Sequence, residues 1–231
     1  MSQENLKTLY DLAYKWGTDK AIGAPGYHGY SVVYENLFKN VQNNEIRLLE
    51  IGVAAGQSIA MWYEYFINSK IHCIDDINRK LTDEIIKELT QTNRVFFQQG
   101  DQGDRLFLTS MYNLFGGEDF DIIVDDGSHQ PNHQMISFAH LFPHLKSGGY
   151  YIIEDITIPE SEVILNVPNN IETYNTIIDF KDKGILKSNF VTDDENLYLQ
   201  NNILNIEIHY SNKESSFPPY GKWGVAIIEK K

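Results

Sequence analysis

The sequence predicts an α/β fold built on a doubly wound, mostly parallel sheet of seven strands, with helices before it and an antiparallel hairpin at its C-terminal end. Two observations support this prediction. Between residues 46 and 153, short apolar runs rich in β-branched residues alternate with segments of helical periodicity. Glycine or acidic residues follow most of these runs directly, which is typical of the turns after parallel strands.

Two amphipathic segments precede the expected sheet. Residues 4–16 carry apolar side chains at helical spacing, and residues 30–41 do the same. The glycine-rich stretch 17–30 between them is expected to form a lid loop. We therefore expect residues 1–45 to form N-terminal helices and a lid, and residues 46–231 to form the main domain.

The body of the chain alternates between strands and helices in a Rossmann-like order. Strands are expected at residues 46–51, 70–77, 95–98, 120–124 and 150–153. Helices are expected at residues 58–66, 81–89, 105–114 and 132–145. After residue 155 the pattern weakens, and the expected elements are a helix at 171–182, a strand pair within 190–200, and strands at 204–210 and 223–229.

The composition narrows the class of protein. The formal net charge of −13 disfavours nucleic acids and anionic membranes as partners, because an acidic surface repels both. The single cysteine, Cys73, excludes an intrachain disulfide and a zinc site of the cysteine type. No run approaches the roughly 18 apolar residues of a membrane span, and the first residues lack the pattern of a signal peptide. We therefore expect a cytoplasmic protein.

The turn after the first strand has the pattern acid-x-Gly-x-x-x-Gly, formed by Glu50, Gly52 and Gly56. Glycine allows a sharp turn and a close approach of the backbone to a ligand. The dinucleotide fingerprint requires glycine where Ala54 and Gln57 stand, and a Walker A loop requires lysine in place of Gln57. The turn therefore suits neither pyrophosphate nor triphosphate. A nucleoside site and an ordinary turn between strand and helix remain open.

The ends of the next two strands favour the nucleoside. Asp75 ends the second strand, where an acid can accept both hydroxyls of a ribose. Asp101 and Gln102 follow the third strand, where a polar side chain can reach an adenine amino group. Together with the glycine turn, these residues predict a nucleoside-binding site.

Acidic residues also follow the fourth and fifth strands. Neighbouring parallel strands lie roughly 4.8 Å apart, so Asp126, Glu154 and Asp155 are expected to meet at one edge of the sheet. Close carboxylates repel one another, and a divalent cation such as Mg²⁺ relieves that repulsion. The alternative is that these acids cap helices or face water. His129 lies three residues beyond Asp126, and its ordinary pKa of ~6.5 suits a general base at neutral pH.

The order EIG-x3-G, IDD, GDQ, FDIIVDDGSH and GGYYIIED resembles class I S-adenosylmethionine-dependent methyltransferases, and more narrowly the metal-dependent macrolide-sugar O-methyltransferases of the mycinamicin and macrocin type. The resemblance covers residues 12–156, including the GTDK motif at 17–20. It implies a cofactor site formed by Glu50, Gly52, Gly56, Asp75 and Asp101. The remaining expected cofactor-binding residues are Lys20, Ser58, Gln102 and Asp125. It also implies that Asp126, Glu154 and Asp155 bind the metal, with His129 as the general base.

One departure from the resemblance lies in the glycine turn. Many class I enzymes have a middle glycine where this chain has Ala54, so a slightly altered turn is expected. The expected function is S-adenosylmethionine-dependent, Mg²⁺-assisted methyl transfer to a hydroxyl of a small molecule such as a sugar. Acceptor selection is expected in residues 157–220, where no motif is recognisable, and a homo-oligomer is expected. Two alternatives remain: a diverged metal-binding relative with hydroxylase-like chemistry, and a non-catalytic nucleoside-binding module.

Overall fold

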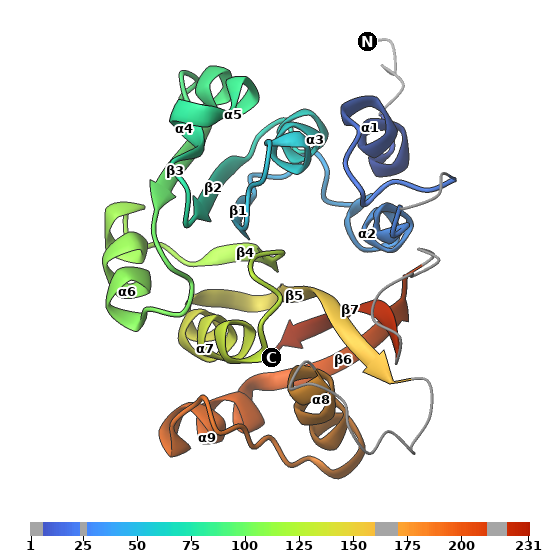
Figure 1. Cartoon of the computed structure of the whole chain (residues 1–231), viewed down its shortest axis with the longest axis vertical. Helices are drawn as coiled ribbons and strands as arrows, with labels where there is room; N and C mark the ends of the chain where they lie inside the picture. Colours follow the sequence, from blue (N-terminus) through green and yellow to red (C-terminus); the bar gives the residue numbers. More distant parts are fainter. Residues whose placement is uncertain (1–6, 24–26, 160–170, 212–220) are drawn as a thin grey trace.

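The computed structural model describes residues 7–23, 27–159, 171–211 and 221–231 (Figure 1). Its sheet has the strand order β3-β2-β1-β4-β5-β7-β6. The strands are β1 (Arg47–Ile51), β2 (Lys70–Asp75), β3 (Val95–Gln99), β4 (Phe120–Asp125), β5 (Leu145–Pro159), β6 (Ile203–Tyr210) and β7 (Gly221–Lys230). Strands β1 to β5 pair in parallel, and β7 pairs antiparallel with both β5 and β6. The predicted fold class, including the C-terminal hairpin, is confirmed.

Helices cover both faces of this sheet (Figure 1). The helices are α1 (Leu9–Trp16), α2 (Tyr30–Phe38), α3 (Gln57–Tyr65), α4 (Arg79–Thr82), α5 (Glu84–Leu89), α6 (Arg105–Leu114), α7 (Pro131–Leu141), the 3₁₀ turn η1 (Phe142–His144), α8 (Glu172–Lys183) and α9 (Asp193–Asn202). Successive residues of a strand point to opposite faces, so Leu48 packs into the core beneath α1–α3 and Leu49 into the core beneath α6 and α7. The central strands are therefore apolar on both faces, as a covered parallel sheet requires.

The strand pair expected within residues 190–200 was wrong. This stretch begins α9, and its first turn is fixed by a capping box. The Thr192 side chain accepts a hydrogen bond from the Glu195 backbone N–H, and the Glu195 carboxylate accepts one from the Thr192 backbone N–H. This reciprocal pair satisfies two backbone donors at the helix start, which outweighs the strand-like composition that follows.

Other boundaries differ from the prediction too: the helix expected at 30–41 ends at Phe38, and the strand expected at 70–77 ends at Asp75. The helix expected at 81–89 is divided at Asp83 into α4 and α5. The expected helix 132–145 ends at Leu141 and continues as η1, while β5 extends from Leu145 to Pro159. The long β5 carries Glu154 and Asp155 beyond the end of its parallel partner β4.

Parts of four predictions lie outside the described residues. They are positions 4–6 of the first expected helix, positions 24–26 of the expected lid, positions 160–170 of the expected variable region, and positions 212–220 of the loop before the last strand. Within the described ranges, none of the helices combines the length and the apolar character needed to cross a bilayer.

Candidate active site

A cavity of about 710 Å³ opens at the carboxyl ends of the parallel strands. This is where open α/β sheets bind ligands. The expected site residues that line it are Lys20, Gly52, Ser58, Asp75, Asp101, Gln102, Asp126, His129 and Asp155. The expected residues that do not line it are Glu50, Gly56, Asp125 and Glu154. One cavity therefore brings together most of the residues expected to bind the cofactor and the metal, and four of the expected residues lie behind its wall.

The turn after β1 is shaped by left-handed backbone. Gly52 has φ of 85°, and a Cβ at this position would lie 2.0 Å from the carbonyl oxygen of Asp126. Only glycine fits here, because a larger residue would push the turn away from the loop after β4. Ala54 also has a positive φ, 45°, a conformation that glycine adopts more easily. Alanine in place of the usual middle glycine therefore leaves the backbone at position 54 mildly strained.

Asp75 fastens this turn from the end of β2. Its Oδ2 accepts hydrogen bonds from the backbone N–H groups of Val53 (2.9 Å) and Ala54 (3.3 Å), while Oδ1 contacts Ile77 N (2.9 Å) and Arg79 Nε (3.0 Å). Burial acts to raise the pKa of Asp75, but these donors bring it below its ordinary value. Asp75 is therefore an ionised carboxylate that organises the turn.

The neighbouring Asp76 was not singled out from the sequence, although it is the second acid of the IDD motif. Both acids line the cavity, but Asp76 is exposed whereas Asp75 is buried. An acid directly after a strand that already ends in an acid was the available signal for this residue.

Asp125 is the buried carboxylate at the start of the loop after β4. It is fully buried and accepts hydrogen bonds from Gln102 Nε2 (2.9 Å) and from the Ser137 hydroxyl. Burial raises the pKa of Asp125 to about 6, while the bonds from Ser137 and Gln102 act to lower it. Gln102 in turn accepts the Ser128 N–H at 2.8 Å. These contacts fix the loop that carries Asp126 and His129.

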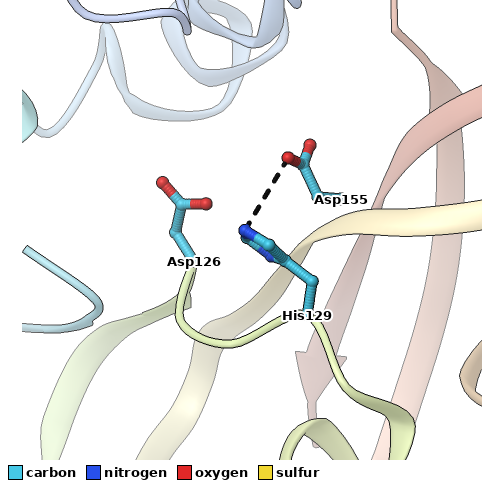
Figure 2. A group of neighbouring side chains, drawn as sticks. All are labelled: Asp126, His129 and Asp155. Atoms are coloured by element: carbon cyan, nitrogen blue, oxygen red, sulfur yellow. Dashed lines mark ion pairs between the residues drawn. The ribbon is translucent and has the colours of Figure 1, made fainter. Parts of the chain in front are cut away.

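Asp126, His129 and Asp155 face one another in the cavity (Figure 2). Their potential metal-ligand atoms all lie within 4.8 Å of one another, and His129 Nε2 is 4.0 Å from Asp155 Oδ2. His129 and Asp155 have φ values of 57° and 53°. In the described parts of the chain, these two residues and Ala54 are the non-glycine residues with positive φ, and all three line this cavity. Backbone strain of this kind concentrates at functional sites.

An irregularity in β5 brings Glu154 and Asp155 into the same region. Successive strand residues normally point to opposite faces, but the register between β5 and β7 shifts between Ile153 and Ile156. Both carboxylates then meet α2: the Tyr34 hydroxyl donates to Glu154 Oε1 at 2.7 Å, and the Tyr30 hydroxyl donates to Asp155 Oδ1 at 3.0 Å. Burial and the nearby carboxylates raise the pKa of both tyrosines well above the ordinary value, so both keep their protons.

Lys20 provides a buried positive charge to the same cluster. Its side chain is 1% exposed, and its Nζ pairs with Asp126, with Glu154 Oε2 at 3.0 Å and with Glu50 Oε1 at 3.9 Å. Burial alone would lower the pKa of Lys20, but these carboxylates raise it well above its ordinary value. Burial also raises the pKa of Glu50 to about 7, against the effect of Lys20. Three carboxylates therefore share this one ammonium group.

Comparison with known proteins identifies the central part of the chain. Residues 49–156 match the family described as "Methyltransferase domain". The MycE methyltransferase of the mycinamycin biosynthetic pathway, solved in complex with Mg, S-adenosylhomocysteine and mycinamycin VI, superposes with a TM-score of 0.70 at 27% identity. That superposition covers 98% of this chain and 55% of MycE. Residues 49–156 thus correspond to a methyltransferase domain, in a fold similar to that of MycE.

Two curated relatives of this chain are named as O-methyltransferases. The mycinamicin VI 2''-O-methyltransferase of Micromonospora griseorubida is 37% identical over 136 residues, which is 56% of this chain and 32% of that enzyme. The demethylmacrocin O-methyltransferase of Streptomyces fradiae is 34% identical over 152 residues, 63% of this chain and 34% of that enzyme. The chain thus spans about a third of the length of these relatives. The resemblance stated from the sequence motifs is confirmed.

The family match begins at Leu49. The N-terminal residues that contact Glu154 and Asp155 come before this position in the sequence. Lys20, His28, Tyr30 and Tyr34 all lie before it and all contact the acidic cluster. Of these four residues, the sequence singled out only Lys20 as a site residue, and assigned it to the cofactor. The Tyr-x-x-x-Tyr spacing on one face of α2 was the available signal for the tyrosines.

Proposed function

We propose that this protein transfers the methyl group of S-adenosylmethionine to a hydroxyl oxygen of a small molecule, with a divalent cation assisting. The observation that carries the proposal is that one cavity holds both the glycine turn after β1 and the cluster Asp126, His129 and Asp155. Cofactor and acceptor can therefore be held side by side, and positioning of this kind is a large part of catalysis when the methyl donor is already activated.

The cofactor is proposed to lie along the carboxyl ends of β1, β2 and β3. The residues that we assign to it there are Gly52, Ser58, Asp75, Asp76, Asp101 and Gln102. Glu50, Gly56 and Asp125 support this part of the site from behind the cavity wall. Lys20 differs from the expectation, because its ammonium group is engaged by carboxylates and we assign it to the acidic cluster.

The residues present fit a hard divalent cation such as Mg²⁺. Asp126 and Asp155 would hold it, since both offer a carboxylate oxygen to the cavity, and His129 lies within the same group. When bound, such a cation lowers the pKa of an acceptor hydroxyl and orients it. Glu154, the third expected ligand, has one oxygen on Tyr34 and the other on Lys20. It can become a ligand only if Lys20 moves.

His129 is proposed as the general base. Its side chain is about one-third exposed, and within the described parts of the chain its Nδ1 has no hydrogen-bond partner. The imidazole accepts the proton that the acceptor hydroxyl loses. The acceptor oxygen then forms a bond to the methyl carbon as the carbon–sulfur bond breaks, which leaves S-adenosylhomocysteine as a neutral thioether.

The relatives favour a sugar hydroxyl of a natural product as the acceptor. The curated relatives described above are named as O-methyltransferases of mycinamicin VI and demethylmacrocin, a further relative is named as a methyltransferase of a rhamnosyl tetracenomycin, and MycE was solved with mycinamycin VI. The described helices α8 and α9 occupy the region after β5 in which acceptor selection was expected. We therefore propose a glycoside with neighbouring hydroxyls as the acceptor class.

Calorimetry with S-adenosylhomocysteine, with and without Mg²⁺, tests this function. Binding of S-adenosylhomocysteine is expected, and absence of binding in both conditions would overturn the proposal. Methyl transfer from labelled S-adenosylmethionine to a panel of glycosides then tests the reaction. Asp126→Asn should abolish transfer, whereas Asp179→Asn on the exposed face of α8 should not change it. Unchanged transfer by Asp126→Asn would separate this carboxylate from the reaction, whereas binding of S-adenosylhomocysteine without any transfer by the wild-type protein would instead favour the non-catalytic binding module.

A further inference from the structure

Helix α2 contacts two adjacent carboxylates with two tyrosines one turn apart. Tyr30 and Tyr34 lie at positions i and i+4, so their side chains share one face of the helix. The Tyr30 hydroxyl lies 3.0 Å from Asp155 Oδ1, and the Tyr34 hydroxyl lies 2.7 Å from Glu154 Oε1. Both ring systems are almost completely buried. The two bonds thus look alike, but they act on carboxylates with different surroundings.

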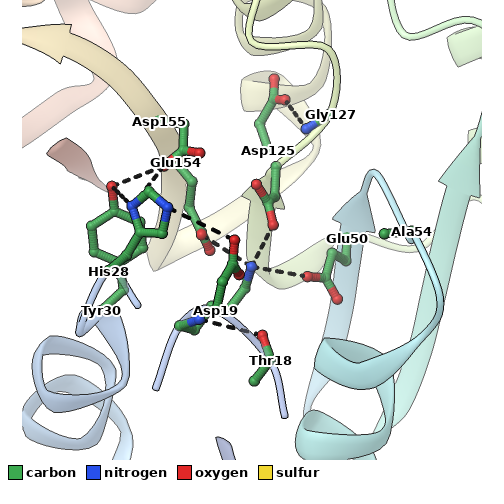
Figure 3. A network of polar contacts seen from close by, with 12 residues as sticks. Thr18, Asp19, His28, Tyr30, Glu50, Ala54, Asp125, Gly127, Glu154 and Asp155 are labelled. Carbon is green, nitrogen blue, oxygen red and sulfur yellow. Dashed lines mark hydrogen bonds and ion pairs between the residues drawn. The ribbon is translucent and has the colours of Figure 1, made fainter. Parts of the chain in front are cut away.

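The two oxygens of Asp155 face different side chains. Oδ1 is held from the N-terminal side by the Tyr30 hydroxyl and by His28 Nδ1 at 3.2 Å, and these two side chains are themselves 3.1 Å apart (Figure 3). Oδ2 lies on the side of His129 Nε2, at 4.0 Å. Binding of Oδ1 therefore fixes the rotation of the carboxylate, so that Oδ2 is presented to the cavity.

Glu154 has no such free oxygen. Oε1 accepts from Tyr34 and Oε2 pairs with Lys20 at 3.0 Å, and its side chain is 2% exposed. Loss of the Tyr34 hydroxyl would leave the Lys20 pair in place. This difference makes Tyr34 the natural control for Tyr30, because both belong to one helix and both donate one buried hydrogen bond to a carboxylate.

We propose that Tyr30, together with His28, is a positioning residue for the divalent cation: it holds Asp155 with Oδ2 turned toward Asp126 and His129. This inference rests on the proposed function, in which Asp155 binds the cation. A fixed orientation is needed here because Asp155 sits at φ 53° in an irregular stretch of β5, without the regular pairing that would orient its side chain. Partners of metal ligands commonly orient them in this way.

The test compares Tyr30→Phe with Tyr34→Phe in the full-length protein, using Mn²⁺ alone as the probe. Calorimetry gives the Mn²⁺ dissociation constant, the electron paramagnetic resonance spectrum reports the symmetry around bound Mn²⁺, and thermal unfolding reports the fold. Tyr30→Phe is expected to weaken Mn²⁺ binding by about 10- to 100-fold and to change the spectrum. Tyr34→Phe is expected to lower the unfolding temperature similarly, with a dissociation constant within about threefold of wild type.

Two outcomes would overturn this inference while leaving the proposed function intact. One is that the wild-type protein binds Mn²⁺ and that Tyr30→Phe binds it with the same dissociation constant. The other is an equal loss of affinity in both variants, since the hydroxyls would then act through the fold in general. Absence of Mn²⁺ binding in the wild-type protein would overturn the metal part of the proposed function and the role of Tyr30 with it.

Discussion

The side-chain carbonyl of Gln102 accepts the backbone N–H of Ser128 at 2.8 Å, which joins the end of the third strand to the loop after the fourth. The amide group of the same side chain donates to Asp125. One glutamine therefore links the part of the cavity assigned to the cofactor with the part that carries His129.

Replacing Gln102 by methionine, a side chain of similar length, should destabilise the protein and weaken S-adenosylhomocysteine binding. The substitution leaves the Ser128 N–H without its acceptor and removes one donor from buried Asp125. Each buried hydrogen bond lost in this way costs about 1–3 kcal/mol, so the loss of both should lower the unfolding free energy by about 2–6 kcal/mol in urea denaturation. Gln99→Met, which removes an exposed hydrogen bond, should cost less than about 1 kcal/mol. Equal losses in the two variants would contradict the linking role.

Lys20→Met should destabilise the protein strongly, because Asp126, Glu154 and Glu50 lose their common cation. Removal of one partner from a buried ion pair costs about 3–5 kcal/mol. Mg²⁺ should raise the unfolding temperature more in this variant than in the wild-type protein. In the variant the ammonium group of Lys20 is missing, so Mg²⁺ has to relieve the whole repulsion among the carboxylates. Thermal unfolding with and without Mg²⁺ measures both effects.

Lys15→Met is the control for the Lys20 variant. Lys15 pairs with Glu64 at the exposed surface, and such pairs contribute about 0–1 kcal/mol. A loss as large as that of Lys20→Met would show that removal of any lysine from this part of the chain has the same effect. A Lys20→Met protein that Mg²⁺ does not stabilise beyond wild type would separate Lys20 from the cation site.

Gly52→Ala should prevent formation of the native turn. The added Cβ would lie 2.0 Å from the carbonyl oxygen of Asp126, which is backbone and cannot rotate away. Gly184→Ala serves as the reference, since Gly184 also has a positive φ, 67°, but has no neighbouring atom within 4 Å of the added Cβ. Gly184→Ala should cost about 1–2 kcal/mol from the left-handed backbone alone. Gly52→Ala should cost clearly more in urea denaturation and abolish S-adenosylhomocysteine binding; similar costs would refute the close approach.

His72 should make the protein less stable in acid. Burial lowers the pKa of His72 to about 3, with Arg47 and Lys70 adding to the effect, and Phe96 and Phe115 pack against the ring. The folded protein therefore keeps His72 neutral, whereas the unfolded chain protonates it below a pH of ~6.5. This contribution to stability is complete above that pH and is lost progressively as the pH falls toward 3.

His72→Phe should remove that part of the pH dependence. Between pH 7 and pH 4, the unfolding free energy of the wild-type protein should fall by about 2–3 kcal/mol more than that of the variant. Urea denaturation at several pH values measures the difference. The contributions of the other titrating groups to the pH dependence cancel, because both proteins contain these groups. Parallel pH profiles would show that His72 becomes protonated within the fold.

The sheet could be predicted from the sequence because buried strands leave continuous apolar runs, and the ends of parallel strands meet at one edge. The same reasoning brought Asp126 and Asp155 together. It could not foresee that Glu154 turns toward Lys20, because regular alternation along a strand says nothing about an irregularity in β5.

The contacts made by α2 were beyond the reach of local patterns. Tyr30 and Asp155 are 125 positions apart, and no periodicity connects them. The helix α9 was missed for a different reason, because its capping box at Thr192 and Glu195 was present in the sequence but the composition after it was read as strand. Start signals of helices are therefore more informative here than average composition.

The ion pair between Lys20 and Asp126 joins positions 106 residues apart, and this separation affects the order in which the protein forms on the ribosome. The segment with Lys20 leaves the ribosome long before β4 and β5 have been synthesised, and its ammonium group then remains hydrated. Closure of so long a loop is slow compared with helix formation. The proposed cation site is therefore expected to assemble among the last parts of the fold, only after the strand that carries Asp155 is complete.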